Sequence, residues 1–228
     1  MIIDGFNKLT LLDYPGHLSA IIFTRGCNFK CPFCQNSSLV LNKSHEKGNY
    51  SEDEVLAYLK KRQGILQGIV ISGGEPTIQK NLKDFIKNVK KLRYDVKLDT
   101  NGSNPNLLRE LIDEKLIDYV AMDIKNSFLR YSETAGKKIV EDKIKESIKI
   151  LKENKIDFEF RTTISKELHD YESIKKICEY IGKDTKYFLQ NYNDSDTVLQ
   201  RGLHGFTDSE LEEFRIKLIK DFPKIEIR

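Results

Sequence analysis

Six short apolar runs, rich in Val, Ile and Phe, recur along the chain and are separated by amphipathic segments. The runs cover residues 18–24, 68–72, 94–100, 118–124, 157–163 and 186–192. Several are almost continuously apolar, which is typical of parallel strands buried on both faces. Strands that alternate with helices predict a parallel sheet with right-handed crossovers. The pattern leaves open whether this α/β sheet is doubly wound or curls into part of a barrel.

The segments between these runs carry helix signals. Ser51 with Glu54 and Thr207 with Glu210 form capping boxes, and Gly182 is a helix C-cap candidate. A last short strand is expected at 224–228, and the polar stretch 42–50 is expected to be a loop. Because no proline- or serine-rich linker divides the chain, residues 1–228 are interpreted as one domain.

Charge and hydropathy exclude several functional classes. The net charge is only +3, and lysines alternate with acidic residues as on solvated helix faces, so we expect no nucleic-acid partner. No apolar run approaches the roughly 20 residues that span a membrane, and no signal peptide is evident. Clustered cysteines without a secretion signal favour a reducing cytoplasm and a metal site over disulfides.

Polar or glycine residues follow every apolar run. In parallel α/β folds, ligands bind at the carboxyl ends of the strands, so we expect these residues to face one side. They are the cysteine loop 26–34, Gly73, Gly74, Glu75, Asp99, Thr100, Asn101, Asp123, Lys125, Arg161, Gln190 and Asn191.

Cys27, Cys31 and Cys34 are spaced C-x3-C-x2-C on the loop after the first run. A structural zinc site needs four ligands, normally in two pairs, and neither His17 nor His45 completes one. A [4Fe–4S] cluster with full protein ligation takes four cysteines, so three would leave one iron open for a reagent. The spacing therefore favours an iron–sulfur site with a vacant position.

The other strand ends suit a small zwitterion joined to a nucleoside. Glu75 is a partner for an ammonium group, and Lys125 and Arg161 are partners for a carboxylate. Phe33 lies between two cysteines and could pack against an adenine. Residues with amides suited to ribose hydroxyls are Asn101, Gln190 and Asn191.

Three further residues are expected to have structural rather than functional roles. Cys178 lies in an amphipathic segment with Ile174 and Ile177, where a small buried hydrophobe is expected. His169 and His204 are expected at the surface or at a helix edge.

The phrases "CNFKCPFC" and "GGEP" together resemble the radical S-adenosylmethionine (SAM) superfamily. More narrowly, "FTRGCNFKCPFCQN", "VISGGEPT", "KLDTNGSNP", "YVAMDIK" and "FEFRTTI" resemble the activating proteins of anaerobic ribonucleoside-triphosphate reductase, which are related to glycyl-radical-enzyme activases. The resemblance runs from about residue 3 to about residue 200.

This resemblance implies a partial (β/α)6 TIM-like barrel of parallel strands, open on one side. It implies that the three cysteines bind a [4Fe–4S] cluster and that SAM binds its unique iron. The implied lining of SAM comprises Gly73, Gly74 and Glu75 at the methionine amino group, Asp99, Thr100, Asp123 and Lys125 at the methionine end, and Arg161 and Gln190 beyond them. A monovalent cation can also sit at the methionine end. The segment Tyr14–Gly16 matches a family phrase to which no role is assigned.

The implied activity is reductive cleavage of SAM to a 5′-deoxyadenosyl radical, which takes hydrogen from a glycine of a partner glycyl radical enzyme. A flavodoxin or ferredoxin-type protein would supply the electron. Because the cofactor carries the chemistry, no side chain is nominated as a catalytic acid or base. Two alternatives remain open, namely a radical SAM enzyme acting on a small molecule and a non-catalytic iron–sulfur electron-transfer module.

Overall fold

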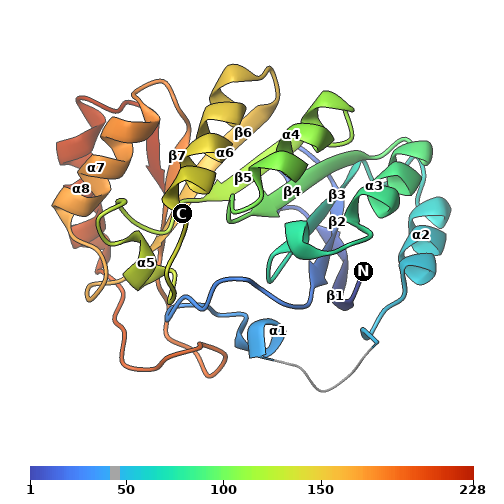
Figure 1. Ribbon diagram of the computed structural model, residues 1–228, viewed down its shortest axis with the longest axis horizontal. Coiled ribbons are helices and arrows are strands. Elements are labelled where there is room, and N and C mark those ends of the chain that lie inside the picture. The colour runs from blue at the N-terminus through green and yellow to red at the C-terminus, as the bar shows by residue number, and fades with distance from the viewer. Residues whose placement is uncertain (42–46) are drawn as a thin grey trace.

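The computed structural model describes residues 1–41 and 47–228 (Figure 1). Residues 42–46 of the loop expected at 42–50 lie outside the described residues. All eight strands form one sheet in chain order. They are β1 (Ile3–Thr10), β2 (Ser19–Thr24), β3 (Gly68–Gly73), β4 (Asp95–Thr100), β5 (Tyr119–Asp123), β6 (Asp157–Ile164), β7 (Tyr187–Asn191) and β8 (Ile225–Ile227). Strands β2 to β7 confirm the six predicted runs, and β8 confirms the last one.

The helices lie mainly on one face of this sheet (Figure 1). They are α1 (Ser37–Leu41), α2 (Glu52–Lys61), α3 (Leu82–Lys91), α4 (Pro105–Asp113), α5 (Tyr131–Thr134), α6 (Glu141–Glu153), α7 (Tyr171–Ile181) and α8 (Asp208–Ile219), with a 3₁₀ turn at Pro76–Ile78. Both predicted capping boxes are present, at Ser51 and at Thr207, and α7 ends at Gly182 as expected. Among the described residues, no helix is long and apolar enough to cross a membrane.

Strand β1 was not predicted, and it pairs antiparallel with β2. Its sequence, "IDGFNKLT", lacks the continuous apolar run of the other strands, and only Ile3 is buried. An edge strand has one neighbour and is partly solvated, so it does not need the apolar composition of a central strand. The sheet is therefore parallel from β2 to β8, with one antiparallel edge.

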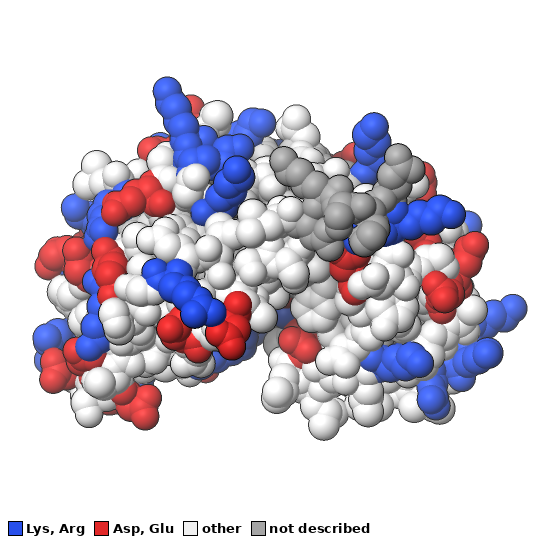
Figure 2. Space-filling view, turned by 90° about the horizontal axis from the view of Figure 1, so that it is seen from below, with Lys and Arg blue, Asp and Glu red and all other residues white. Residues whose placement is uncertain are grey.

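The sheet curls without closing. Strands β1 and β8 stand at opposite ends of the strand order, and no pairing joins them in the part of the chain that the structure describes. Figure 2 shows the resulting hollow between two lobes of the molecule. The architecture is thus a partial TIM-like barrel that is open on one side, as the resemblance implied.

The concave face of the sheet has a small apolar cluster of its own, formed by Tyr14, Ile21, Val70 and Tyr119. A Cβ added to Gly68 would lie 2.9 Å from the Tyr14 ring, so the ring packs directly on the backbone of β3. The segment that follows β1 therefore fills part of the half-barrel. This is a packing role for Tyr14, to which the sequence alone assigned none.

Candidate active site

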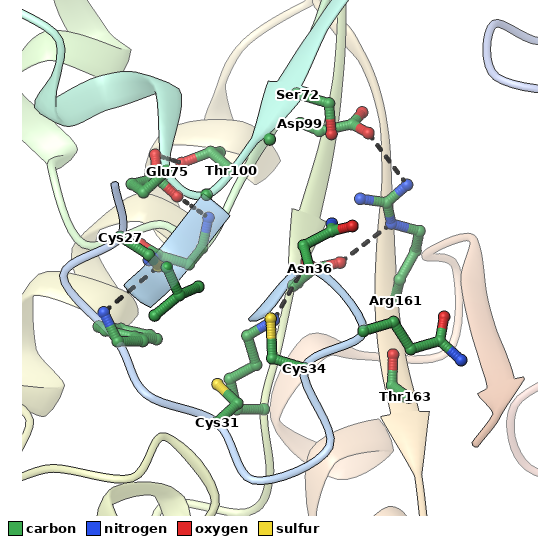
Figure 3. Close-up of a pocket in the computed structure, with 18 of the residues that line it drawn as sticks. Cys27, Cys31, Cys34, Asn36, Ser72, Glu75, Asp99, Thr100, Arg161 and Thr163 are labelled. Carbon is green, nitrogen blue, oxygen red and sulfur yellow. Dashed lines mark hydrogen bonds and ion pairs between the residues drawn. The ribbon is translucent and has the colours of Figure 1, made fainter. Parts of the chain in front are cut away.

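A cavity of about 390 Å³ lies at the carboxyl ends of the strands (Figure 3). That volume is in the range of small-molecule and cofactor sites. All of the predicted site residues except Asn191 line it, namely Cys27, Cys31, Phe33, Cys34, Gly73, Gly74, Glu75, Asp99, Thr100, Asn101, Asp123, Lys125, Arg161 and Gln190. Asn191 is not part of the lining, because its side-chain amide bonds to the backbone of Phe206 at 2.7 and 2.9 Å. The structure therefore does not bring the Asn191 side chain into the cavity with the other predicted residues.

The cysteine loop is held from both sides by backbone hydrogen bonds. Lys30 N donates to Ala135 O just after α5, at 2.9 Å. On the other side, Leu199 N donates to Cys34 O at 2.9 Å. Because segments that follow β5 and β7 both bond to it, the loop is positioned across the mouth of the half-barrel.

The donor set fits a [4Fe–4S] cluster better than a single metal ion. All three cysteines are free and line the same cavity. Yet within residues 1–41 and 47–228, no group of three Cys, His, Asp or Glu side chains converges closely enough to hold one ion. Tetrahedral zinc–sulfur bonds of about 2.3 Å would bring the sulfurs within roughly 4 Å of one another. In a cluster each cysteine binds a different iron, so the sulfurs stand farther apart.

Burial sets the protonation of two of these thiols. It raises the pKa of Cys27 to about 11 and that of Cys31 to about 12. Both groups are thus neutral thiols until a metal displaces the proton. The backbone N–H of Phe29 already donates to Cys27 Sγ at 3.3 Å, which favours the thiolate form.

Gly73, the last residue of β3, and Gly74, the next residue, allow close packing against β2 and the cysteine loop. A Cβ on Gly74 would lie 1.9 Å from Gly26 O, and one on Gly73 would lie 2.2 Å from Thr24 N. Glu75 N also donates to Gly26 O at 2.8 Å. Although both glycines line the cavity, their lack of side chains is explained first by this contact between backbones.

The Glu75 carboxylate is buried and accepts four hydrogen bonds. Oε1 accepts from Thr77 N, Thr77 Oγ1 and Thr100 Oγ1 at 3.0, 2.5 and 2.7 Å, and Oε2 accepts from Asn101 N at 2.7 Å. Burial raises the pKa of this carboxyl, and the donated bonds oppose that rise. Glu75 therefore ties the loop after β3 to the end of β4, while its contact with an ammonium group stays a prediction.

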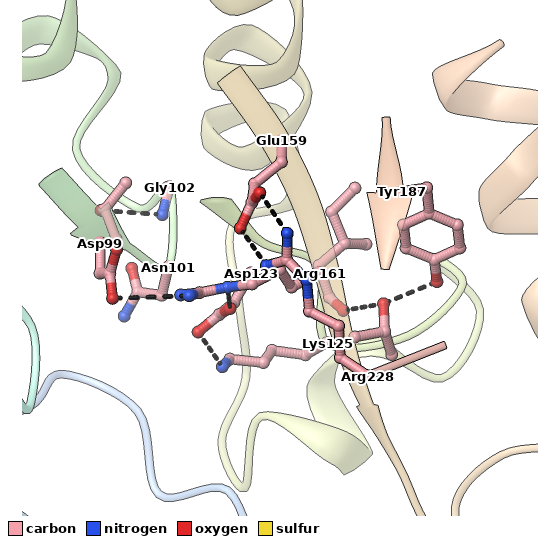
Figure 4. Close-up of polar contacts among 12 residues, drawn as sticks. Asp99, Asn101, Gly102, Asp123, Lys125, Glu159, Arg161, Tyr187 and Arg228 are labelled. Atoms are coloured by element: carbon pink, nitrogen blue, oxygen red, sulfur yellow. Dashed lines mark hydrogen bonds and ion pairs between the residues drawn. The ribbon is translucent and has the colours of Figure 1, made fainter. Parts of the chain in front are cut away.

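Five charged side chains form a network on the concave face, and Figure 4 shows four of them, Asp99, Asp123, Lys125 and Arg161. Asp123 Oδ1 accepts from Arg161 Nε at 3.0 Å, and its Oδ2 accepts from Lys125 Nζ at 3.1 Å. Arg161 also reaches Asp99 Oδ2 at 3.5 Å, and Lys97 Nζ lies 3.3 Å from Asp99 Oδ1. Burial raises the pKa of Asp123, but the positive charges of Arg161 and Lys125 outweigh this effect and hold that pKa below its usual value.

One oxygen in this network is left over. Asp99 Oδ1 is buried and makes no hydrogen bond within the described part of the chain, even though Lys97 Nζ is nearby. A buried acceptor without a donor is costly unless a ligand or water satisfies it. Since Asp99 lines the cavity, this oxygen is suited to a donor group of a bound molecule.

Sequence reasoning missed several residues of the lining, namely Asp13, Phe29, Gln35, Asn36, Val40, Ser72 and Thr163. Thr163 could have been found, because it lies two residues after Arg161 on the same face of β6. Asp13 could not, because the segment after β1 reaches the cavity only through the tertiary fold.

His169 was expected at the surface or at a helix edge. It directly precedes Asp170, the N-cap of α7, but a surface position was wrong, because only 2% of it is exposed. Its Nδ1 accepts from Ser165 N at 3.2 Å, so Nε2 carries the proton and donates to Lys125 O at 2.8 Å. The ring also packs near Phe33, with a centroid separation of 6.2 Å. His204 is exposed and Cys178 is buried in α7, as predicted.

Fold and site together define an α/β enzyme of the partial-barrel class, with a cysteine-lined cavity at the strand ends. Residues 21–181 match the family described as the radical SAM superfamily, and the chain belongs to it. It is a radical SAM enzyme, and its cofactors are a [4Fe–4S] cluster and SAM.

Two relatives come from Methanocaldococcus jannaschii, and both are named "putative glycyl-radical enzyme activating enzyme". MJ1227 is 36% identical over 203 residues, covering 86% of this chain and 81% of the relative. MJ1632 is 30% identical over 193 residues, covering 82% and 68%. The crystal structure of Streptococcus suis SuiB bound to S-adenosylmethionine matches with a TM-score of 0.73 at 15% identity, over 91% of this chain and 49% of SuiB. At that identity the match shows the fold.

Proposed function

We propose that this enzyme activates anaerobic ribonucleoside-triphosphate reductase by forming a glycyl radical on it. The observation that carries the proposal is that one cavity, at the carboxyl ends of the strands of an unclosed barrel, gathers all three cysteines and every other predicted site residue except Asn191. The printed names of the two Methanocaldococcus relatives support the glycyl-radical type. The reductant would be a flavodoxin or ferredoxin-type protein of a reducing cytoplasm.

Within this proposal, Cys27, Cys31 and Cys34 are the three ligands of the cluster. When bound, the cluster and SAM supply a 5′-deoxyadenosyl radical, and the chain's own residues bind and orient them. Asp99 Oδ1 has Lys97 Nζ 3.3 Å away but no hydrogen bond within the described residues, and it would accept from the amino group of the methionine moiety. Lys125 also lines the cavity, and its positive charge suits the carboxylate of the methionine moiety.

The remaining lining residues suit the rest of the molecule. Phe33 offers an apolar ring for the adenine, and Asn101 and Gln190 offer amides for the ribose. Three side-chain cations already face the carboxylates of Asp99 and Asp123. A monovalent cation bound there would add to the positive charge that the protein itself supplies. Its binding stays a proposal.

Within this proposal, a glycine-bearing loop of the protein substrate would enter the cavity at the carboxyl ends of the strands. The exposed Leu9, Leu11 and Leu12 are not part of that entrance, because Thr10 pairs with Ser19 at the amino end of β2.

The test uses reductase labelled with α-deuterated glycine, incubated anaerobically with the iron-loaded enzyme, SAM and a reductant. The proposal predicts that 5′-deoxyadenosine gains deuterium from the reductase. Unlabelled 5′-deoxyadenosine together with label transfer from a small metabolite would instead support the small-molecule alternative.

A further inference from the structure

Three exposed lysines without ionic partners lie beside the cysteine loop. They are Lys30, Lys137 and Lys138. Across residues 1–41 and 47–228, no carboxylate lies within ion-pair distance of any of the three, whereas Lys83, Lys145 and Lys166 on the helices and loops all have such partners. We call these three residues the lysine triad.

Backbone contacts bring the lysine triad together although its members are distant in sequence. Lys30 N donates to Ala135 O at 2.9 Å. A Cβ on Gly136, which has a φ of +67°, would lie 1.9 Å from Lys30 O and 3.2 Å from Lys30 Cβ. Lys137 N in turn donates to Ser132 O at 3.1 Å, which fixes the turn after α5. The triad thus begins one residue before Cys31.

The surroundings of the triad favour a protein partner. Leu129 before α5 is 83% exposed, and Val140 after the turn is 61% exposed, so apolar side chains flank the positive charges. Apolar contact area with a charged rim is the usual composition of a protein interface. Surfaces for single-stranded nucleic acid instead combine a basic groove with exposed aromatic rings on which bases stack.

We propose that the lysine triad is the docking surface for an acidic protein that delivers single electrons to the cluster. The inference rests on the proposed ligation by Cys27, Cys31 and Cys34. In each encounter the donor is oxidised by one electron and the cluster is reduced by one. The positive charge of the triad steers an acidic donor to the side of the loop that carries Cys31, the proposed cluster ligand next to Lys30. Such steering speeds association more than it tightens binding.

The test compares two charge-reversal variants of the iron-loaded enzyme. One carries Lys30→Glu, Lys137→Glu and Lys138→Glu. The matched control carries Lys155→Glu, Lys183→Glu and Lys186→Glu, three exposed lysines that precede β6 and β7 at the opposite edge and have no ion pairs within the described residues. Stopped-flow absorbance follows cluster reduction by an acidic flavodoxin hydroquinone and, separately, by uncharged photoreduced deazariboflavin.

We expect the triad variant to be reduced by flavodoxin at least about tenfold more slowly than wild type, with a flatter dependence on salt. Deazariboflavin should reduce all three proteins equally, which also shows that the variants hold their clusters. Equal flavodoxin rates in the triad variant and wild type, or equal slowing in the control, would overturn the proposal. So would RNA binding at physiological salt that only the triad variant loses. Glycyl radical formation is not part of the measurement, so failure of the proposed target would be seen separately.

Discussion

Asp123 and Arg161 are register partners on β5 and β6, and Arg161 Nε lies 3.0 Å from Asp123 Oδ1. The pair stands at the last residue of β5, where the parallel ladder fixes both backbones before any ligand arrives. Since Lys125 and Asp99 join the same network, the charges of the cavity are preorganised rather than assembled on binding. Preorganised charges avoid the cost of reorientation when a charged ligand binds.

Replacing Arg161 with Ala should weaken SAM binding by at least about tenfold and lower the stability by about 3–5 kcal/mol. The reason is that truncating one partner of a buried ion pair leaves Asp123 and Asp99 undercompensated. Calorimetric titration with SAM and denaturant unfolding measure the two effects. Arg161→Lys keeps the charge without the two-point geometry. Its SAM affinity and its stability should lie between those of wild type and Arg161→Ala. Unchanged SAM affinity in Arg161→Ala would remove Arg161 from the site.

Replacing Cys31 with Ala should abolish assembly of the cluster, because only three cysteines line the cavity. Iron content per chain after anaerobic reconstitution is the measurement. Cys178→Ala is the matched control, since Cys178 is buried in α7 away from the cavity and its loss should cost about 1 kcal/mol of stability with iron unchanged. A halved iron content in Cys178→Ala would show that this cysteine ligates after all.

Replacing Gly74 with Ala should displace the cysteine loop and sharply reduce iron incorporation. The added Cβ would clash with Gly26 O, which is a backbone atom and cannot move aside as the end of a side chain could. Gly202→Ala is the control, because nothing lies within 4 Å of the added Cβ, although Gly202, unlike Gly74, has a positive φ, of +87°. The control should lose only about 1–2 kcal/mol to backbone strain. Full iron content in Gly74→Ala would contradict the packing argument.

His169 should make the metal-free protein less stable as the pH falls. Burial lowers the pKa of His169 to about 4, despite the hydrogen bonds at Lys125 O and Ser165 N, and Arg130 lowers it further while Asp170 opposes. The unfolded chain, with a pKa near 6.5, binds more protons between these values, so stability is present above pH 6.5 and is lost toward pH 4.

From pH 7 to pH 5 this contribution amounts to about 2 kcal/mol. Urea unfolding at both values should show that loss in wild type and a smaller loss in His169→Gln, whose amide replaces a neutral imidazole. Equal losses in the two proteins would indicate that His169 is not neutral in the folded state.

Much of the site was predictable because parallel strands place their carboxyl ends on one edge. Polar residues after six apolar runs were therefore enough to assemble the lining, from Gly73 to Gln190. What escaped prediction depends on tertiary packing. Strand β1 is an edge strand without a clear pattern, Asp13 reaches the cavity across the concave face, and His169 is buried by neighbours from other elements. Glu75 was recognised as a site residue, but its four backbone and hydroxyl donors were not foreseeable from the sequence.

The most direct test of the account is an electron paramagnetic resonance spectrum of the reductase after anaerobic incubation with the iron-loaded enzyme, SAM and reductant. The account predicts a doublet from a glycyl radical, whose splitting collapses when the reductase carries α-deuterated glycine, and no signal with the Cys31→Ala enzyme. Formation of 5′-deoxyadenosine by the wild-type enzyme without any radical on the reductase would contradict it.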